Sequence, residues 1–464
     1  MLFNSPTYLI FFLAVFCLYW LARRRVAQNV LLLLAGYVFY GTWSWQFLGV
    51  LWFCTLLNYT CGRLIGSAPT RSGRRALLVA GTVINLGTLA VCKYLGYFVQ
   101  PDSVLLQVVV PVGISFYTFQ NLSYVIDVHR GKVQPERNLL DYALFAAFFP
   151  VLLAGPIERA THLLPQLQQP RVFSGAAVET GLQLMAWGIF KKVVIADNLA
   201  PYVDAVFAQP AGYSPATLFT AAVFFALQIY CDFSGYSAVA RGTARTLGIE
   251  VMVNFDLPYF SRTPVEFWRR WHISLSQWFH DYVYDPLASH GKYRAYLVTM
   301  VLIGLWHGAK WTFVLFGLYW GVVIVAYLYL ADRSKSAPAE RAPPAPWQLL
   351  LSTVGMFAIA CIGWILFRAR TLGDFWTILS GMIVPVGHEH LLRLEVLDVR
   401  LLWALVLGLW AAELVYRNGP RLVAAATGGA VRRLLWRYAM VCIIVLSYVA
   451  AQHGHGQPFI YFQF

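Results

Sequence analysis

Residues 303–309 read Ile303-Gly304-Leu305-Trp306-His307-Gly308-Ala309 and lie in an uncharged run, 295–309, that directly precedes a longer apolar run. An ionisable side chain at membrane depth costs free energy, so a functional role is the default interpretation of such a histidine. The interpretation of His307 therefore depends on whether the surrounding segments lie in a membrane.

The composition is typical of a polytopic membrane protein. Of the 464 residues, 59% are hydrophobic and 12% are charged, and the mean hydropathy is +0.60, which is far more apolar than a soluble chain of this size. The net charge of +14 indicates basic cytoplasmic loops that face anionic lipid. We therefore expect membrane lipid, and no nucleic acid, as a partner.

Apolar segments near the ~20-residue spanning length predict an all-α protein with roughly ten to a dozen membrane helices. The segments are 8–22, 76–92, 140–153, 217–231, 311–331, 349–367, 401–414 and 434–450. Residues 26–62 carry no charge between two basic loops, which favours two passes with a turn near 41–44 over one long tilted helix. The N-terminal segment lacks the features of a cleaved signal, so we expect it to be retained with Met1 outside.

Proline, glycine and lysine divide the chain further. They interrupt the apolar stretches 104–125 and 181–196, where we expect broken or partly buried helices, and prolines preclude a continuous helix at 332–347. These features predict a membrane core at 1–331, a polar linker at 332–347 and C-terminal membrane helices at 348–464.

The cysteines and paired histidines give no strong metal signal. The seven cysteines lie mostly singly in apolar runs without CxxC pairs, so we expect reduced, packed thiols. His388-Glu389-His390 and His453-Gly454-His455 lack further ligands at the usual spacing, and we interpret them as a solvated loop and terminus. We therefore expect no bound metal.

Residues 242–294 are dense in aromatic and charged side chains. The order Thr263, Pro264, Glu266 is a capping-box pattern, so a helix begins at Pro264. At 100° per residue, one continuous helix presents an aromatic stripe with His272 at its border. The stripe contains Phe267, Trp268, Trp271, Leu275, Trp278, Phe279 and Tyr282.

This helix has two interpretations. In the first it lies at the membrane interface, where tryptophans anchor at the headgroups and His272 is a satisfied edge residue. In the second, Arg269 and Arg270 bind a phosphorylated donor beside Trp268 and Trp271, and His272 lies close to the reacting group. The helix alone does not decide between them.

Asp232 ends an apolar run beside two hydroxyl side chains and a glycine turn. A carboxylate at the edge of the hydrocarbon either pairs with a base inside the bundle or caps a helix. We favour pairing, with His307 or an arginine as the partner. We expect Asp232, Ser234, Tyr236 and Trp306 to support the site.

His307 has the properties of a general base. Its uncharged run is shorter than the ~30 Å hydrocarbon layer, and Gly304 and Gly308 leave space beside it for a substrate or another backbone. A neutral imidazole takes a proton from a hydroxyl as the hydroxyl attacks a carbonyl. The chain has no Gly-x-Ser-x-Gly elbow, HExxH, Walker loop or supported GxGxxG, which leaves direct acyl transfer.

Six motifs occur in order: PVGISFYTFQ (111–120), LSYVID (122–127), AGPIER (154–159), DFSGYS (232–237), EFWRRWHISL (266–275) and LWHG (305–308). They resemble the successive signatures of the membrane-bound O-acyltransferase family and, within it, the bacterial alginate O-acetyltransferase branch. Residues 458–464 also resemble the end of that branch. Two departures are Leu318-Tyr319-Trp320-Gly321, which lacks a histidine usual in the family, and Ala288-Ser289, which replaces a glycine pair.

The resemblance implies a ring of about ten to twelve helices, some short or re-entrant, around a central tunnel. It implies that His307 is the catalytic histidine and His272 a second important histidine. It further implies that acetyl passes from a cytoplasmic thioester, acetyl-CoA in the first instance, to an alginate-like exopolysaccharide or another cell-envelope glycan. The resemblance also implies that no cofactor is bound, that a periplasmic SGNH-type acetylase is a partner and that the protein lies in the bacterial inner membrane.

Two other classes of function remain open. One is a transporter or flippase for an anionic lipid-linked sugar, with Asp232, Arg269 and Arg270 along the pathway. The other is a scaffolding subunit of an export complex. Neither consumes an acyl thioester, and neither requires His307.

Overall fold

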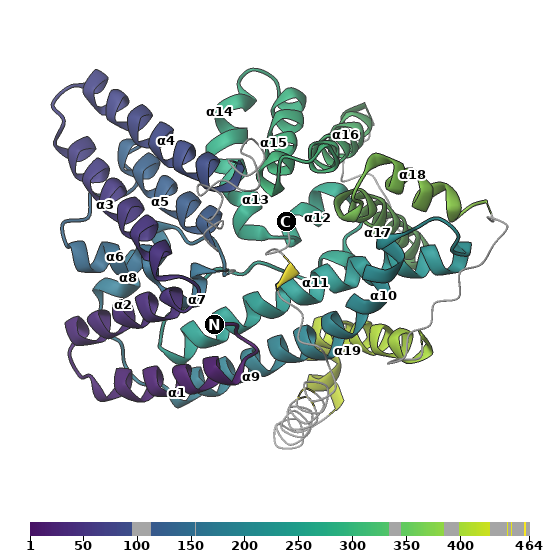
Figure 1. Cartoon of the computed structure of the whole chain (residues 1–464), viewed down its shortest axis with the longest axis horizontal. Coiled ribbons are helices and arrows are strands. Elements are labelled where there is room, and N and C mark those ends of the chain that lie inside the picture. The colour runs from purple at the N-terminus through teal and green to yellow at the C-terminus, as the bar shows by residue number, and fades with distance from the viewer. Residues whose placement is uncertain are drawn as a thin grey trace. The chain divides into compact units, whose positions relative to one another are not determined.

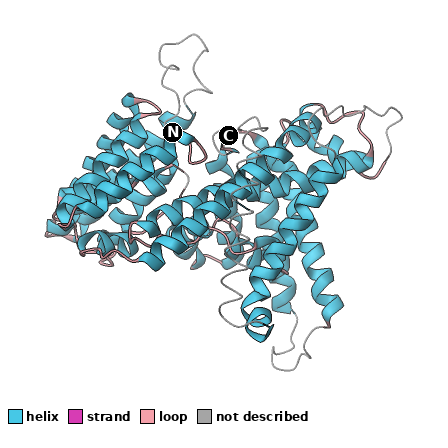
Figure 2. Cartoon of the chain, turned by 90° about the horizontal axis from the view of Figure 1, so that it is seen from below, coloured by secondary structure: helices cyan, strands magenta, loops and turns pink. Residues whose placement is uncertain are grey.

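The computed structural model describes residues 1–94, 113–153, 155–333, 345–384, 399–426, 443, 447, 459 and 460. Within these ranges the chain forms helices and no strand (Figure 1, Figure 2), which confirms the all-α class. The chain divides into two compact units: a first unit of residues 1–188 and 236–254, and a second unit of residues 189–235 and 255–464. The expected linear division at 332–347 remains a prediction, because residues 334–344 lie outside the described ranges.

The first unit holds the N-terminal helices. They are α1 (Pro6–Leu21), α2 (Arg25–Gly41), α3 (Trp45–Ser67), α4 (Arg71–Tyr94), α5 (Ile114–His129), α6 (Leu139–Ala147), α7 (Phe149–Leu152), α8 (Ala160–Gln168) and most of α9 (Gly175–Phe190). Helix α11 (Pro215–Thr246) begins in the second unit and ends in the first.

The second unit holds most of the remaining elements. They are the π-helix η3 (Lys191–Ala196), α10 (Asp197–Ala208), the 3-10 helix η4 (Pro258–Phe260), α12 (Pro264–Arg270), α13 (Ile273–Phe279), the π-helix η5 (His280–Tyr284), α14 (Asp285–Ala288), α15 (Lys292–His307), α16 (Trp311–Arg333), α17 (Pro346–Arg368), α18 (Leu372–Gly381) and α19 (Val399–Ala426). The predicted interruption of 181–196 corresponds to the change from α9 to η3 at Lys191.

Five helices in the described part are long and apolar enough to cross a membrane: α3, α4, α11, α16 and α17. Helix α1 is apolar but has 16 residues. The predicted span 140–153 instead forms α6 and α7, because Phe148 is extended and Pro150 begins a new turn. The predicted span 434–450 lies almost entirely outside the described residues.

Helix α11 differs from the other long apolar helices in its burial. Protein buries 83% of its apolar stretch, against 17% for α4. A helix that is apolar all round and enclosed by protein belongs to the core. Asp232 lies within α11, and the helix continues through residues 232–237, where we expected a glycine turn.

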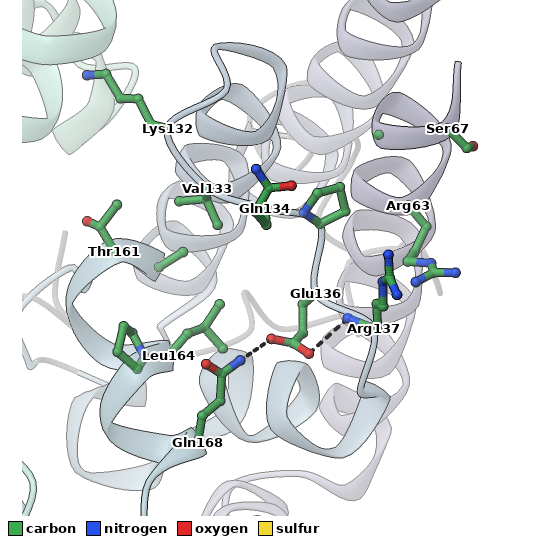
Figure 3. Close-up of a pocket in the computed structure, with 14 residues that line it drawn as sticks. Arg63, Ser67, Lys132, Val133, Gln134, Glu136, Arg137, Thr161, Leu164 and Gln168 are labelled. Atoms are coloured by element: carbon green, nitrogen blue, oxygen red, sulfur yellow. Dashed lines mark hydrogen bonds between the residues drawn. The ribbon is translucent and has the colours of Figure 1, made fainter. Parts of the chain in front are cut away.

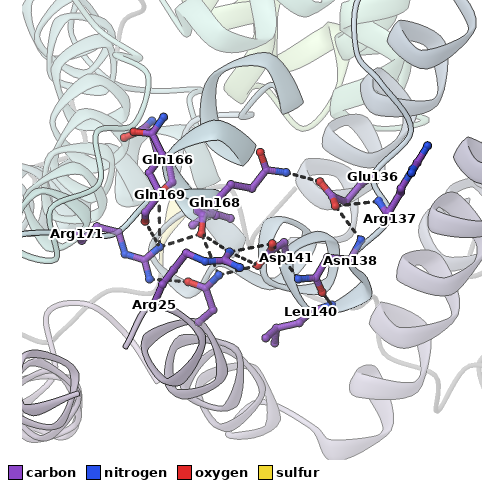
Figure 4. Close-up of polar contacts among 12 residues, drawn as sticks. Arg25, Glu136, Arg137, Asn138, Leu140, Asp141, Gln166, Gln168, Gln169 and Arg171 are labelled. Atoms are coloured by element: carbon purple, nitrogen blue, oxygen red, sulfur yellow. Dashed lines mark hydrogen bonds and ion pairs between the residues drawn. The ribbon is translucent and has the colours of Figure 1, made fainter. Parts of the chain in front are cut away.

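The turn predicted near residues 41–44 is confirmed, because α2 ends at Gly41 and α3 begins at Trp45. The start of α2 is held by a polar network (Figure 4). Arg25 donates to both carboxylate oxygens of Asp141 at 3.0 and 2.9 Å. Asn29 donates to the same carboxylate at 2.7 Å. These contacts tie α2 to α6, since Asp141 lies in the first turn of α6.

Helices α15 and α16 form a close hairpin through glycines. A Cβ at Gly304 would lie 2.2 Å from the Phe313 carbonyl oxygen, and one at Gly317 would lie 2.3 Å from the Met300 carbonyl oxygen. Small residues of this kind let two apolar helices approach at their backbones. The space beside Gly304 is therefore filled by another backbone, which was one of the two expected occupants.

Candidate active site

His307 is the last residue of α15 and is buried, with 6% of its surface exposed. The extended backbone of Gly308 ends the helix directly after it. Phenylalanine rings surround the imidazole, with centroids at 4.8 Å for Phe367, 5.9 Å for Phe316 and 6.1 Å for Phe313. Residues of α16 and the end of α17 therefore enclose the imidazole in protein.

His272 lies at the junction of α12 and α13 with 1% of its surface exposed. Its backbone is left-handed, with φ 42° and ψ 56°, a conformation that costs a non-glycine residue free energy. Leu257 is the other non-glycine residue of positive φ in the described ranges. The Phe233 ring meets the imidazole edge to face at 4.6 Å.

The left-handed backbone at His272 corrects the predicted continuous helix from Pro264. The helix does begin at Pro264, and the Thr263 hydroxyl accepts from the Glu266 N–H at 3.1 Å as the capping box predicts. However, α12 ends at Arg270 and α13 begins at Ile273. Helical periodicity continues across the break, so the pattern of apolar residues could not reveal it. The imidazole consequently projects from a junction and does not lie on a helix face.

Trp306 connects the two histidines. The centroid of its ring lies 4.6 Å from that of His307 and 6.0 Å from that of His272. The indole therefore contacts one imidazole and approaches the other from a single position in the second unit. This arrangement brings together three of the expected site residues.

Asp232 pairs with Lys192, which corrects the expected pairing with His307 or an arginine. Its Oδ1 lies 2.7 Å from Lys192 Nζ, and both side chains are at least 96% buried. Lys192 also pairs with Asp197 at 2.8 Å. The Ile460 N–H donates to Asp232 Oδ2 at 2.6 Å. The partner comes from the π-helix η3, 40 positions earlier in the chain, and the residues around Asp232 do not identify it.

The two predicted hydroxyl residues lie in different units. Ser234 accepts from Lys191 Nζ at 2.8 Å in the second unit. Tyr236 belongs to the first unit, where its ring packs 5.7 Å from Phe3. The sequence had a signal for the lysine partners that we used only as a helix interruption: Lys191 and Lys192 are adjacent charges in an apolar stretch.

The tryptophans of the predicted donor-binding group are packing residues. Trp271 lies 4.6 Å from Trp364 and stacks on Phe267 at 5.8 Å. Trp268 meets Trp320 edge to face at 5.4 Å. Only 2% of the Trp271 surface and 8% of the Trp268 surface are exposed, so a ligand in solution could contact little of either ring.

The arginines of the same group differ from each other. Arg270 pairs with Glu266 at 2.9 Å, four residues before it. Arg269 is exposed and pairs with no carboxylate in the described part of the chain. Only the Arg269 guanidinium is therefore open to an anionic ligand.

The described residues offer one group with metal-ligand chemistry. His280, Asp281 and Asp285 place one possible ligand atom each within 4.8 Å of one another, but none of them is buried. The paired histidines 388, 390, 453 and 455 lie outside the described ranges. Cys54, Cys61, Cys231 and Cys361 are buried, as expected, whereas Cys17 is exposed.

Comparison with known proteins gives a family for this arrangement. The model of the membrane-bound O-acyltransferase family matches residues 133–367, a range that contains His272, His307 and Asp232. The chain belongs to the membrane-bound O-acyltransferase family. It is thus an acyltransferase and a multi-pass membrane protein, and the resemblance of its motifs to this family is confirmed.

Curated relatives match the whole of this chain or a large part of it. A probable alginate O-acetylase of Azotobacter vinelandii is 33% identical, with 100% of both chains covered. A peptidoglycan O-acetyltransferase of Helicobacter pylori is 29% identical over 82% of this chain and 80% of its own. A teichoic acid D-alanyltransferase of Streptococcus thermophilus is 27% identical over 57% of this chain and 69% of its own.

Proposed function

We propose that this membrane-bound O-acyltransferase moves an acetyl group from a cytoplasmic thioester, acetyl-CoA in the first instance, to a hydroxyl of a cell-envelope glycan. One observation carries the proposal: two buried imidazoles, His307 at the end of α15 and His272 at the α12–α13 junction, have ring centroids 4.6 and 6.0 Å from that of the Trp306 indole. Buried histidines in a membrane acyltransferase are suited to proton transfer at the reacting hydroxyl.

In this mechanism His307 is the general base. Its imidazole takes the proton of the acceptor hydroxyl while the oxygen attacks the thioester carbonyl carbon. The carbon–sulfur bond then breaks, and the departing thiolate takes the proton back from the imidazolium. The aromatic environment of Phe316 and Phe367 excludes water, which otherwise competes with the acceptor for the acyl group.

His272 has a supporting role in the same reaction. Burial lowers the pKa of His272 to about 3, so its imidazole is neutral at physiological pH and too weakly basic to be the main proton acceptor. A neutral imidazole still donates and accepts hydrogen bonds. We assign His272 to orienting a reactant, with Trp306 fixing its distance from His307.

The binding of the donor falls to fewer residues than the sequence predicted. Arg269 is the exposed cation three residues before His272 and would hold a phosphate of the donor. Trp268 and Trp271 fix the backbone of α12 through their packing, which keeps Arg269 and His272 in place.

The acceptor class rests on the relatives. Those named above are an alginate O-acetylase, a peptidoglycan O-acetyltransferase and a teichoic acid D-alanyltransferase, and all three names refer to polymers of the cell envelope. We propose an alginate-like exopolysaccharide as the acceptor, reached directly or through a periplasmic SGNH-type acetylase. The proposal includes an inner-membrane location, Met1 outside, and ten to twelve helices around a central tunnel.

The test is acetyl transfer by purified full-length chain in lipid nanodiscs, with labelled acetyl-CoA and alginate oligosaccharides, and with the candidate partner acetylase present in a second series. His307→Ala should lower the transfer rate about 10²–10⁴-fold. His290→Ala is the matched control, because His290 is exposed and outside the site. Equal rates for parent and a folded His307→Ala variant would refute the assignment.

The same assay separates the enzyme from a transporter. A flippase for a lipid-linked sugar moves its substrate without consuming a thioester, so release of free CoA that depends on acceptor marks acyl transfer. Membership of an acyltransferase family already favours the enzyme.

A further inference from the structure

The first unit contains a cavity of about 970 Å³, and its lining includes none of the residues proposed for catalysis. The end of α3, residues 132–137 and one side of α8 line it. Figure 3 shows Lys132 at one end with Arg63 and Arg137 at the other. Its volume is far larger than a phosphate ion and suits a ligand of headgroup or nucleotide size.

The wall of this cavity is held by contacts with α3 and α5. The Glu136 N–H donates to the Tyr124 hydroxyl at 2.9 Å, and the Tyr59 hydroxyl donates to the Arg137 carbonyl at 2.7 Å. Gly66 of α3 packs against Pro135 so closely that a Cβ would lie 2.2 Å from Pro135 Cγ. The cavity therefore has a built frame, and the Arg137 side chain extends from an anchored backbone.

The single carboxylate of the lining is occupied within this frame. Glu136 Oε1 accepts from the N–H groups of Arg137 and Asn138, both at 2.8 Å, and Oε2 accepts from Gln168 Nε2 at 2.5 Å (Figure 4). Because three donors already occupy this carboxylate, it does not pair with the cations of the lining.

The three cations of the lining are open. In the described part of the chain, Arg63, Lys132 and Arg137 form no ion pair, and all three side chains are exposed. The charge of the lining is thus three positive against one engaged negative. Guanidinium groups bind phosphate oxygens in pairs, which makes Arg63 and Arg137 the strongest of the three candidates.

The position of the cavity favours the headgroup level of a membrane. Arg63 lies near the end of the candidate span α3, next to Leu64, which is 46% exposed. Arg71, Arg74 and Arg75 lie in the first turns of α4, and the segment after α5 carries Arg130, Lys132 and Arg137. The positive-inside rule assigns such basic segments to the cytoplasmic side.

We propose that this cavity binds the phosphate group of an anionic ligand, with Arg63 and Arg137 as its principal ligands and Lys132 as a third cation. Two sources supply this chemistry: the headgroup of an anionic phospholipid, and a soluble phosphate compound of the cytoplasm. The proposal does not depend on acyl transfer by His307.

The experiment measures binding of two probes to purified full-length chain in a zwitterionic detergent. One probe is short-chain phosphatidylglycerol, with short-chain phosphatidylcholine as its uncharged counterpart, and the other is ADP. Arg63→Gln and Arg137→Gln should each lower the affinity for the probe that binds by about tenfold or more. Arg75→Gln is the matched control, since Arg75 is an exposed arginine of the neighbouring α4 that does not line the cavity.

Tight binding of phosphatidylglycerol but not ADP assigns the site to a lipid headgroup, and the reverse assigns it to a soluble phosphate. Either result supports the proposal if the two lining variants weaken binding and Arg75→Gln does not. Failure of both probes to bind would overturn it. So would equal weakening by Arg75→Gln, because diffuse surface charge would then explain the attraction.

Discussion

Lys192 and Asp232 form a buried ion pair, with Nζ 2.7 Å from Oδ1. The same carboxylate accepts from the N–H of Ile460, and the neighbouring Phe459 ring lies 5.5 Å from Phe233. Phe233 in turn contacts the His272 imidazole at 4.6 Å. A carboxylate of α11 thus connects the π-helix η3 and a C-terminal residue with the surroundings of His272.

Asp232→Ala should lower the free energy of unfolding by about 3 kcal/mol, the low end for removal of one member of a buried pair, because Asp197 still neutralises Lys192. Asp204→Ala is the control, since its pair with Arg368 leaves the Asp204 side chain 44% exposed and contributes about 1 kcal/mol or less. Denaturant titration in detergent measures both. Equal losses would contradict a special role for the buried pair.

Ile460→Pro removes the N–H that donates to Asp232 while keeping an apolar side chain. A hydrogen bond to a charged group contributes about 1.5–3 kcal/mol, so we expect a stability loss of that order and slower acetyl transfer through the displaced Phe459. Ile460→Val retains the N–H and should behave like the parent. If the proline variant kept the stability and activity of the parent, the C-terminal residues Phe459 and Ile460 would have no supporting role at the site.

The low pKa of His272 makes a prediction about pH. Its pKa of about 3 in the folded state lies below the ordinary value near 6.5, so the unfolded chain binds a proton first as the pH falls. The associated stability is complete above about pH 6.5 and is lost towards pH 3. Between pH 7.5 and pH 5 the parent should lose about 2 kcal/mol more than His272→Asn, a residue that tolerates the left-handed backbone.

Denaturant titrations at the two pH values give this difference directly. His162→Asn provides the comparison, because the Glu158 carboxylate raises the pKa of His162 and gives an effect of opposite sign. If parent and His272→Asn lose the same stability, the His272 imidazole is not held neutral by burial.

Gly304→Ala tests the contact between α15 and α16. Its Cβ would meet the Phe313 carbonyl, so we expect a loss of about 1–3 kcal/mol from overpacking and a displaced His307. Gly355→Ala in α17 meets no atom within 4 Å and should be neutral or slightly stabilising, since alanine favours helix. Thermal unfolding and acetyl transfer measure the two effects, and equal behaviour of both variants would rule out the close contact.

Local patterns predicted the parts of this structure that local interactions determine. The capping residue Thr263 fixed the start of α12, and the uncharged run between basic loops gave two helices with a turn at residues 42–44. The left-handed backbone of His272 has no such signal, because the aromatic periodicity continues through it. The imidazole at this position packs against Phe233, a residue distant in sequence.

The sequence predicted some residues of the site and missed the partners of others, because local patterns do not report long-range packing. His307, His272 and Trp306 stood out as polar or aromatic residues in unusual surroundings, and they lie together. The partner of Asp232 depends on how η3 packs against α11, and the burial of Trp268 and Trp271 depends on α16 and α17. Such long-range contacts leave no trace in the spacing of residues along one segment.

The central claim is that the His307 imidazole accepts the proton of the attacking hydroxyl. The most direct measurement is a single-turnover reaction of folded His307→Gln with labelled acetyl-CoA and saturating acceptor, because glutamine keeps a polar side chain of similar reach but is no base. The account predicts unchanged donor binding and a transfer step slowed about 10²–10⁴-fold. Transfer at the parental rate would contradict it.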